Sequence, residues 1–197
     1  VRAPGTNCDE ETAFAFTQVG AKTSSLHINY LIEHPSIGAE FQILCFPGGF
    51  SFGDDIAAGR ILAQRLHVHP QELVDSFRTK QRLVLGICNG FQVMMRLGIF
   101  FPEETFPQAS SHPPATLTLN QQARFEDRWV HLKAGAPHCV FLRDIDHIFL
   151  PMAHAEGRFV FRDPSSQQQL LDASQLAFRY CDENGETSDT QLDFPWN

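Results

Sequence analysis

The sequence predicts an α/β fold with an open, mainly parallel sheet and helices on both faces. Short, strongly apolar segments alternate with segments of helical spacing through the first hundred residues. Two of the apolar segments end directly in glycine-containing turns, as strands of such sheets commonly do. The chain is also 43% hydrophobic, which is enough to form a core and excludes intrinsic disorder.

Length and charge narrow the class of protein further. The 197 residues predict a single domain, 1–197. Fifteen basic against 23 acidic side chains give a formal charge of −8, which argues against a nucleic-acid clamp. No apolar run approaches the roughly 18 residues of a membrane span, and no signal segment begins the sequence. We therefore expect a cytoplasmic protein that binds neither nucleic acid nor membrane.

The first predicted helix follows a turn at residues 4–7. Asp9, Glu10 and Glu11 stand where acidic side chains favour the positive end of a helix dipole, and apolar residues continue toward Gly20. Strands and helices then alternate. The expected elements, in order, are strands at 23–28 and 43–46, a helix over 57–66, a short helix opened by Pro70, a strand at 83–85 and a helix over 91–97.

The second half of the sequence differs in composition and in the pattern of its apolar residues. Residues 98–114 are rich in Pro, Ser and Phe and are expected to form a loop. No convincing inter-domain linker is present. Further strands are expected at 116–119, 129–133, 148–152 and 158–161, and a surface helix or loop at 165–174.

Both ends of the sequence suggest truncation. Residues 1–3 before Pro4 resemble the last residues of a strand whose beginning is absent, and residues 194–197 stop in a loop-like segment. We therefore expect a fold that is incomplete at both ends, and a domain that is incomplete at its C-terminus.

The five cysteines fit neither a disulfide framework nor a metal site. Their number is odd and no C-x-x-C spacing occurs, so we expect no bound metal. Each cysteine is by default a small buried hydrophobe, and Cys8, Cys45, Cys139 and Cys181 are taken as core or turn residues.

Cys88 differs, because it lies in G-x-C-x-G between an apolar strand and a helix. This is the thiol form of the nucleophile elbow, in which small neighbours, here Gly86 and Gly90, permit a strained backbone. The start of the following helix favours the thiolate, and the Asn89 N–H can face an oxyanion. Taken alone, the motif fits a buried cysteine between two turn glycines equally well.

A second turn is expected at the same sheet edge. The strand at 43–46 runs into residues 47–55 (PGGFSFGDD), and parallel strands end at one edge, where open α/β sheets bind ligands. Backbone N–H groups near Gly49 and Phe50 are candidates for the other oxyanion donor. An ordinary tight turn is the alternative. Asp54 and Asp55 could bind a cation, but acidic residues that open a helix are common.

Taken together, these segments resemble the glutaminase subunits of phosphoribosylformylglycinamidine synthase, a family of class I (triad) glutamine amidotransferases with a flavodoxin-like fold. The nucleophile motif alone marks the superfamily, and the combination points to this family. The matching segments are residues 2–9 (RAPGTNCD), 47–54 (PGGFSFGD), 86–92 (GICNGFQ), 125–129 (FEDRW), 151–159 (PMAHAEGRF) and 180–185 (YCDENG).

The resemblance implies hydrolysis of glutamine to glutamate and ammonia. Cys88 would attack the amide carbon, and the Gly49 region and the Asn89 N–H would hold the oxyanion. The tentative substrate contacts are Gly48, Phe50, Gln92, His154 and Glu156. Gln92 could equally be a surface glutamine on a helix.

The same resemblance implies partners. Ammonia would pass to a large ATP-dependent synthetase subunit that makes formylglycinamidine ribonucleotide in purine biosynthesis, and a small accessory subunit is a further candidate partner. No cofactor is expected in this subunit, while ATP and Mg²⁺ would be used by the synthetase subunit.

One feature of the family's pattern is missing. Its catalytic histidine and glutamate lie in an H-P-E motif near the carboxyl end, and the sequence stops before such a motif. His154 and Glu156 have the H-x-E spacing, but in this family their segment is separate from the catalytic pair, so they are taken as lining or structural residues. These 197 residues are therefore expected to hydrolyse glutamine poorly. Two alternatives stay open, namely an amidotransferase for another acceptor and a non-catalytic partner of the synthetase.

Overall fold

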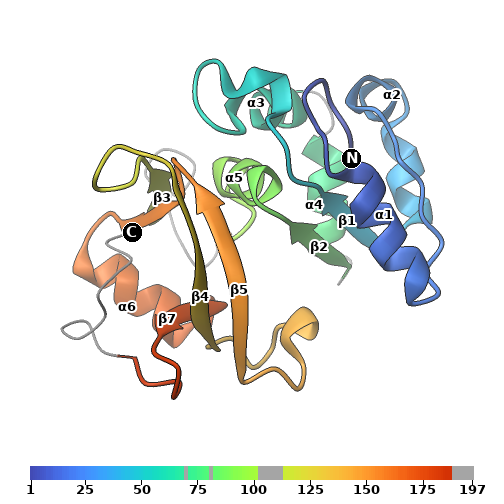
Figure 1. The fold of residues 1–197 in the computed structure, drawn as a ribbon. Helices are drawn as coiled ribbons and strands as arrows, with labels where there is room; N and C mark the ends of the chain where they lie inside the picture. Colours follow the sequence, from blue (N-terminus) through green and yellow to red (C-terminus); the bar gives the residue numbers. More distant parts are fainter. Residues whose placement is uncertain (69–70, 80–81, 102–112, 188–197) are drawn as a thin grey trace. The chain divides into compact units, whose positions relative to one another are not determined.

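The computed structural model describes residues 1–68, 71–79, 82–101 and 113–187 (Figure 1). The chain divides into two compact units, Val1–Pro102 and Glu103–Asn197. Each is described by itself. Across the described ranges, no helix is long and apolar enough to cross a membrane.

The N-terminal unit is built around two parallel strands. β1 (Ile43–Phe46) pairs with β2 (Leu83–Gly86) in a register that sets Phe46 beside Gly86. This confirms the predicted parallel pairing and brings the two glycine-containing turns to one end of the strands. The helices of the unit are α1 (Asp9–Gln18), α2 (Ile28–Glu33), α3 (Arg60–Val68), α4 (Gln71–Thr79) and α5 (Asn89–Arg96), with 3-10 turns η1 (Pro35–Glu40) and η2 (Ser51–Asp54).

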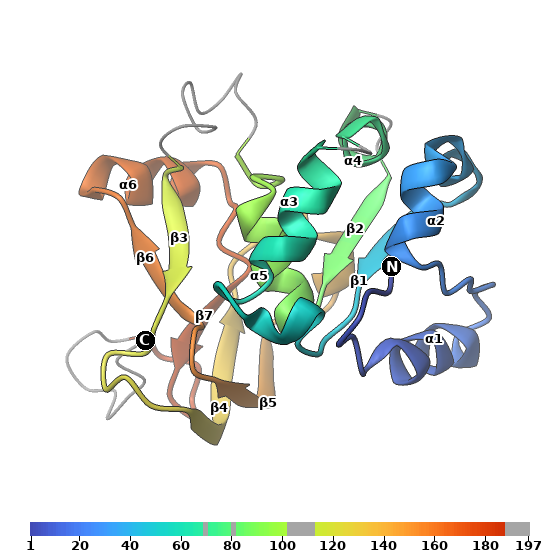
Figure 2. The ribbon, with the colours of Figure 1, turned by 90° about the horizontal axis from the view of Figure 1, so that it is seen from above.

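Helix α5 anchors the strand pair to the core. It contacts both β1 and β2, and α3 packs against it in turn. Val93 and Leu66, one from each helix, are fully buried, and Phe46 of β1 is 1% exposed. Figure 2 shows β1 and β2 side by side, with α5 beginning just beyond the end of β2. The core therefore fixes the start of α5 relative to both strand ends.

The strand expected at 23–28 is wrong. Ile28 begins α2, and the pairing in this region is limited to one parallel bridge between Arg2 and His27. The His27 side chain accepts a hydrogen bond from the Asn29 N–H and so caps the helix. This cap turns an extended, strand-like segment into a helix after a single bridge.

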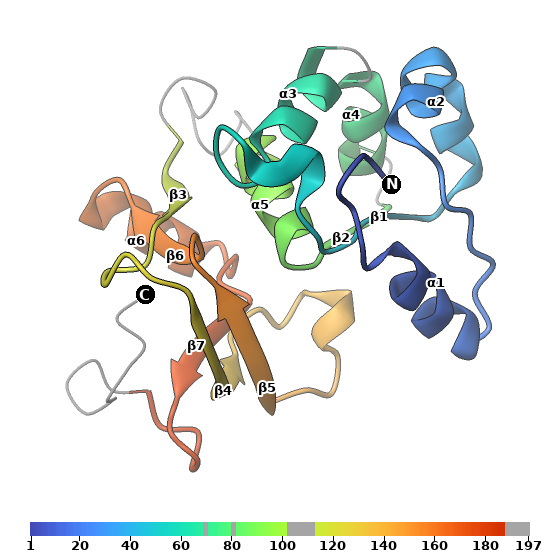
Figure 3. The same ribbon diagram turned by 45° about the horizontal axis from the view of Figure 1, so that its top comes forward.

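The C-terminal unit is built from antiparallel strands (Figure 3). β4 (Glu126–Ala134) lies between β5 (His147–His154) and β7 (Phe178–Cys181), and β3 (Ala115–Thr118) pairs with β6 (Arg158–Phe161). The four strands expected after residue 114 are confirmed, and β7 was missed. The predicted parallel arrangement is thus present in β1 and β2, while the described strands of this half add antiparallel pairs.

Two further elements complete this unit. The helix or loop expected at 165–174 is a helix, α6 (Pro164–Asp172), whose N-cap Asp163 accepts from the Ser166 N–H at 2.7 Å. A short 3-10 turn, η3 (Val140–Leu142), precedes β5. Most of the loop expected at 98–114 lies outside the described residues, as do Pro70 and residues 194–197.

Candidate active site

Cys88 occupies a sharp corner between β2 and α5. The strand ends at Gly86 and the helix begins at Asn89, so Cys88 is the N-cap residue. Its φ of 53° and ψ of −113° lie outside the regions that L-residues favour, and its side chain is exposed. Strained backbone angles at a non-glycine residue are typical of functional sites. The strained, solvent-facing cysteine expected from the motif is therefore present.

The two glycines of the motif are sterically required. A Cβ at Gly90 would come within 2.6 Å of the Phe46 carbonyl carbon, and a Cβ at Gly86 within 2.8 Å of the Gly90 carbonyl oxygen. Both distances are far below van der Waals contact. The start of α5 thus packs directly on the end of β1 with no side chain between them, and the Ile87 N–H donates to the Phe46 carbonyl at 3.0 Å.

The N-terminal segment holds the Gly-Gly turn in place. The Asn7 and Cys8 N–H groups donate to the Gly48 carbonyl at 3.4 and 3.3 Å, and the Phe50 N–H donates to the Gly5 carbonyl at 2.9 Å. These bonds flank an antiparallel bridge between Thr6 and Gly49. In such a non-hydrogen-bonded pair, the N–H and C=O groups of both residues point away from the partner segment. The Gly49 N–H is therefore turned away from residues 5–7.

Two backbone N–H groups remain available near Cys88. Within the described part of the chain, neither the Gly49 N–H nor the Asn89 N–H donates to an acceptor. These are the two oxyanion donors expected from the sequence. The expectation for the Phe50 N–H is wrong, because Gly5 occupies it. The Phe50 side chain is 59% exposed and so could contact a ligand.

A second thiol lies beside Cys88, which the sequence reasoning missed. A Cβ at Gly48 would lie 3.5 Å from the Cys88 Cβ and 3.6 Å from the Cys8 Sγ, so one methyl-sized space separates the two cysteines. Cys8 is exposed, and its thiol donates to Asn7 Oδ1 at 3.1 Å. Desolvation, together with the charges of Glu11, Cys88 and Asp9, raises the pKa of the Cys8 thiol.

The Asn89 side chain connects the two turns. It is 3% exposed, accepts from the Ser51 N–H, and donates to Asp54 and to Gln92 Oε1. The Gln92 oxygen is thus engaged inside the protein. Asp54, weighed from sequence as a cation ligand or helix-opening residue, instead binds this amide. This contact between Asn89 and Asp54 was not predicted from the sequence. The only feature of the sequence that could have indicated it is the polar asparagine directly after the nucleophile.

His154 and Glu156 belong to the C-terminal unit. The His154 Nδ1 lies 2.9 Å from Asn120 Oδ1. The Asn120 amide nitrogen already donates to two carbonyl groups, so its oxygen must accept and His154 Nδ1 must carry the proton. Burial lowers the pKa of His154, opposed by the charge of Glu126. His154 therefore has a structural partner in its own unit.

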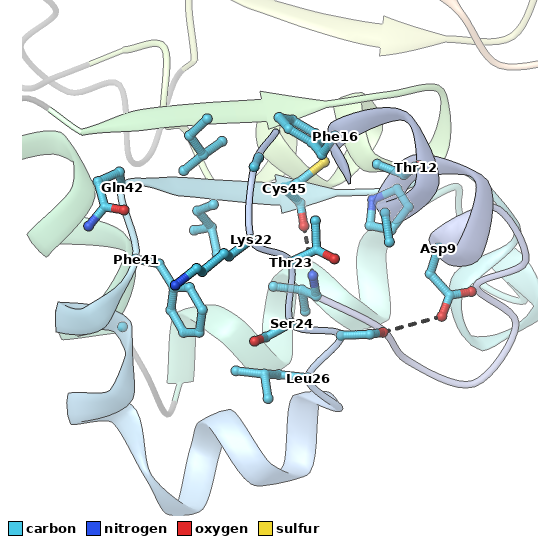
Figure 4. A pocket seen from close by; sticks show the side chains of 18 of the residues that line it. Asp9, Thr12, Phe16, Lys22, Thr23, Ser24, Leu26, Phe41, Gln42 and Cys45 are labelled. Atoms are coloured by element: carbon cyan, nitrogen blue, oxygen red, sulfur yellow. Dashed lines mark hydrogen bonds between the residues drawn. The ribbon is translucent and has the colours of Figure 1, made fainter. Parts of the chain in front are cut away.

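A cavity of about 370 Å³ lies elsewhere in the N-terminal unit (Figure 4). It is lined by Phe16, Leu26, Phe41 and Cys45, among others. Cys88 does not line it. The Val1 ammonium group, also at this cavity, donates to the Cys45 carbonyl at 2.7 Å. The cavity is thus distinct from the thiol site.

Metal ligands are not clustered in the part of the chain that the structure describes. No group of three or more His, Cys, Asp or Glu side chains there could hold an ion. At Cys88, an exposed thiol lies next to two backbone N–H donors, an arrangement suited to acyl transfer.

Comparison with known proteins gives consistent matches. Residues 1–197 match the family model described as a CobB/CobQ-like glutamine amidotransferase domain. "Phosphoribosylformylglycinamidine synthase subunit PurQ" of Methanococcus maripaludis (strain C7) is 40% identical over 194 residues, which cover 98% of this chain and 69% of the relative. The subunit of the same name from Dehalococcoides mccartyi is 40% identical over 187 residues, with 94% and 69% covered.

A solved structure shares the fold. "Structure of PurLQS from Thermotoga maritima" superimposes with a TM-score of 0.62 at 24% identity, covering 83% of this chain and 68% of that chain. This similarity supports the α/β class predicted from the sequence.

Proposed function

Because this chain belongs to the CobB/CobQ-like glutamine amidotransferase family, we propose that it is the glutaminase subunit of a phosphoribosylformylglycinamidine synthase. Relatives with that subunit name are 40% identical over nearly the whole chain. The reaction is hydrolysis of glutamine to glutamate and ammonia. One observation carries the chemistry, namely the exposed Cys88 on the strained corner between Gly86 and Gly90.

In this proposal, Cys88 is the nucleophile. Its Sγ adds to the side-chain amide carbon of glutamine, and the carbonyl oxygen becomes an oxyanion. The Gly49 and Asn89 N–H groups donate to that oxygen, because neither has another acceptor among the residues that the structure describes. The C–N bond then breaks, and ammonia leaves with the proton of the thiol. Water hydrolyses the glutamyl thioester to glutamate and restores the thiol.

The other proposed substrate contacts flank this centre. Gly48 borders Cys88, Phe50 directly follows Gly49 in the same turn, and Gln92 lies one helical turn beyond the nucleophile. We do not assign His154 or Glu156 as the base, because in this family their segment is separate from the catalytic histidine and glutamate. They are proposed as lining or structural residues.

Partner subunits follow from the fate of ammonia, which is protonated and lost unless it is handed over directly. We propose a large synthetase subunit as the acceptor, with a small accessory subunit in the same complex. ATP and Mg²⁺ would be used by the synthetase subunit, and no cofactor by this one. The site of action is proposed to be the cytoplasm.

A glutaminase assay tests the proposal. The native synthetase complex is expected to release glutamate from glutamine, and Cys88→Ala in this chain is expected to abolish this release. Cys139→Ala is the control. Glutamate release that survives Cys88→Ala contradicts the proposal, and a complex that binds the synthetase without any glutamate release favours a non-catalytic partner subunit.

A further inference from the structure

The Asn89 side chain forms hydrogen bonds with the turn that follows Gly49. Its Oδ1 accepts from the Ser51 N–H at 3.1 Å, and its Nδ2 donates to Asp54 Oδ1 at 2.9 Å and to Gln92 Oε1 at 3.1 Å. The group is 3% exposed, so these bonds are shielded from water. One amide therefore joins the start of α5 to the glycine turn.

The backbone at Asp54 has a strained conformation. Its φ is 53°, and Phe52 and Gly53 before it also have positive φ, at 54° and 73°. A non-glycine residue in this region of φ is strained, so other bonds must hold the turn. The Asp54 carboxylate accepts from Asn89 and from the Gly59 N–H at 3.0 Å. Hydrogen bonds to a carboxylate are stronger than those between neutral groups.

The two N–H groups that donate to no acceptor among the described residues are thus linked through the Asn89 amide, which Asp54 holds. One belongs to Asn89 itself, and the other to Gly49, two residues before the Ser51 N–H that the same side chain binds. An oxyanion hole is effective only when its donors are fixed before charge develops. We propose that Asp54 is a positioning residue that, through the Asn89 amide, fixes the separation of the two oxyanion donors. This inference rests on the function proposed above.

Two probes of Cys88 separate this role from a general structural one. Iodoacetamide alkylates the sulfur by displacement at a saturated carbon, and no oxyanion forms. γ-Glutamyl-p-nitroanilide acylates it instead: the Sγ–C bond forms, the C–N bond breaks, and p-nitroaniline leaves with the proton of the thiol. Only the second reaction passes through an oxyanion, so only the second depends on the Gly49 and Asn89 N–H groups.

The experiment compares Asp54→Asn with the unaltered subunit, both in complex with the synthetase. Asp54→Asn keeps the size of the side chain, removes its charge and brings an NH₂ group against Asn89 Nδ2. The acylation rate is expected to fall by about 10-fold to 100-fold, somewhat less than the loss of a whole oxyanion donor costs. The alkylation rate is expected to stay within about twofold, because that reaction needs no oxyanion donor. Asp55→Asn, at the exposed neighbouring carboxylate, is expected to leave both rates unchanged.

Each other outcome has a distinct meaning. An equal fall in both rates, or no fall in acylation, overturns the positioning role. If Asp54→Asn does not fold, Asn89→Ser keeps the backbone N–H but removes the amide, and the same selective loss is expected. If the unaltered subunit is alkylated at Cys88 but never acylated by the glutamyl probe, the proposed glutaminase function fails instead.

Discussion

The backbone of Gly90 lies directly against the carbonyl group of Phe46, so that a Cβ at Gly90 would come within 2.6 Å of the Phe46 carbonyl carbon. This contact joins the first turn of α5 to the last residue of β1. It therefore sets the distance between Cys88, which precedes the helix, and the Gly-Gly turn, which follows the strand.

Gly90→Ala is expected to lower the free energy of unfolding by about 3 kcal/mol, because an added methyl group has no space and backbone atoms must move. Urea unfolding measures the change. Gly20→Ala is the control, since nothing lies within 4 Å of an added Cβ there, and its only strain is a positive φ of 85°, which Gly90 does not share. It is expected to cost only about 1 kcal/mol. Equal losses in the two variants would contradict the close packing at Gly90.

Gly49→Ala is expected to reduce kcat for glutamine hydrolysis by about 10²-fold to 10³-fold, as the loss of an oxyanion donor does. The φ of Gly49 is 138°, and a Cβ there would lie 2.7 Å from the Gly5 carbonyl oxygen, so the peptide must rotate. Gly98→Ala serves as the control for backbone strain, because Gly98 has a φ of 66° and open space around it. A normal kcat in the Gly49→Ala enzyme would show that the Gly49 N–H does not belong to the oxyanion hole.

Unfolding experiments across pH test His154. Burial holds its pKa below the usual 6.5, so the unfolded chain binds more protons than the folded one in the window just below pH 6.5. The free energy of unfolding is therefore expected to fall as the pH is lowered through 6.5 and to be insensitive to His154 above it. His154→Gln should remove this part of the slope.

The control for that experiment is His67→Gln, at an exposed position on α3. It is expected to keep the slope of the unaltered chain. An unchanged slope in His154→Gln would show that the His154 ring is solvated and does not hold Asn120.

Ser51→Ala is expected to leave the free energy of unfolding unchanged or to raise it by up to about 1 kcal/mol. The Ser51 Oγ is buried and has no hydrogen-bond partner among the residues that the structure describes. The bond from Ser51 to Asn89 uses the backbone N–H and survives the change. A loss of more than about 1 kcal/mol would reveal a bound water or another partner for the hydroxyl group.

The sequence was sufficient to predict the elbow because its determinants are local. An apolar strand, two glycines at fixed spacing and a following helix all lie within residues 83–97. The parallel register of β1 and β2 followed from the alternation of strands and helices, and it brought Cys88 and the Gly-Gly turn together as expected.

The features that were missed depend on distant partners. The Phe50 N–H is occupied by Gly5, Cys8 lies across Gly48 from Cys88, and Asp54 binds Asn89. The spacing of residues along the sequence does not predict contacts of this kind. The strand expected at 23–28 failed for a related reason, because β-branched and apolar residues fit both an extended segment and the helix that His27 caps.

Selective labelling of Cys88 by a glutamine-like electrophile tests the central claim most directly. The subunit in its complex is treated with 6-diazo-5-oxo-L-norleucine, and its peptides are mapped by mass spectrometry. Since burial raises the pKa of Cys45 and Cys181 and also that of Cys8, these thiols are expected to react slowly. The predicted result is one adduct, on Cys88, whose formation glutamine slows and which abolishes glutamate release. Adducts spread evenly over the five thiols, with no protection by glutamine, would contradict Cys88 as the nucleophile.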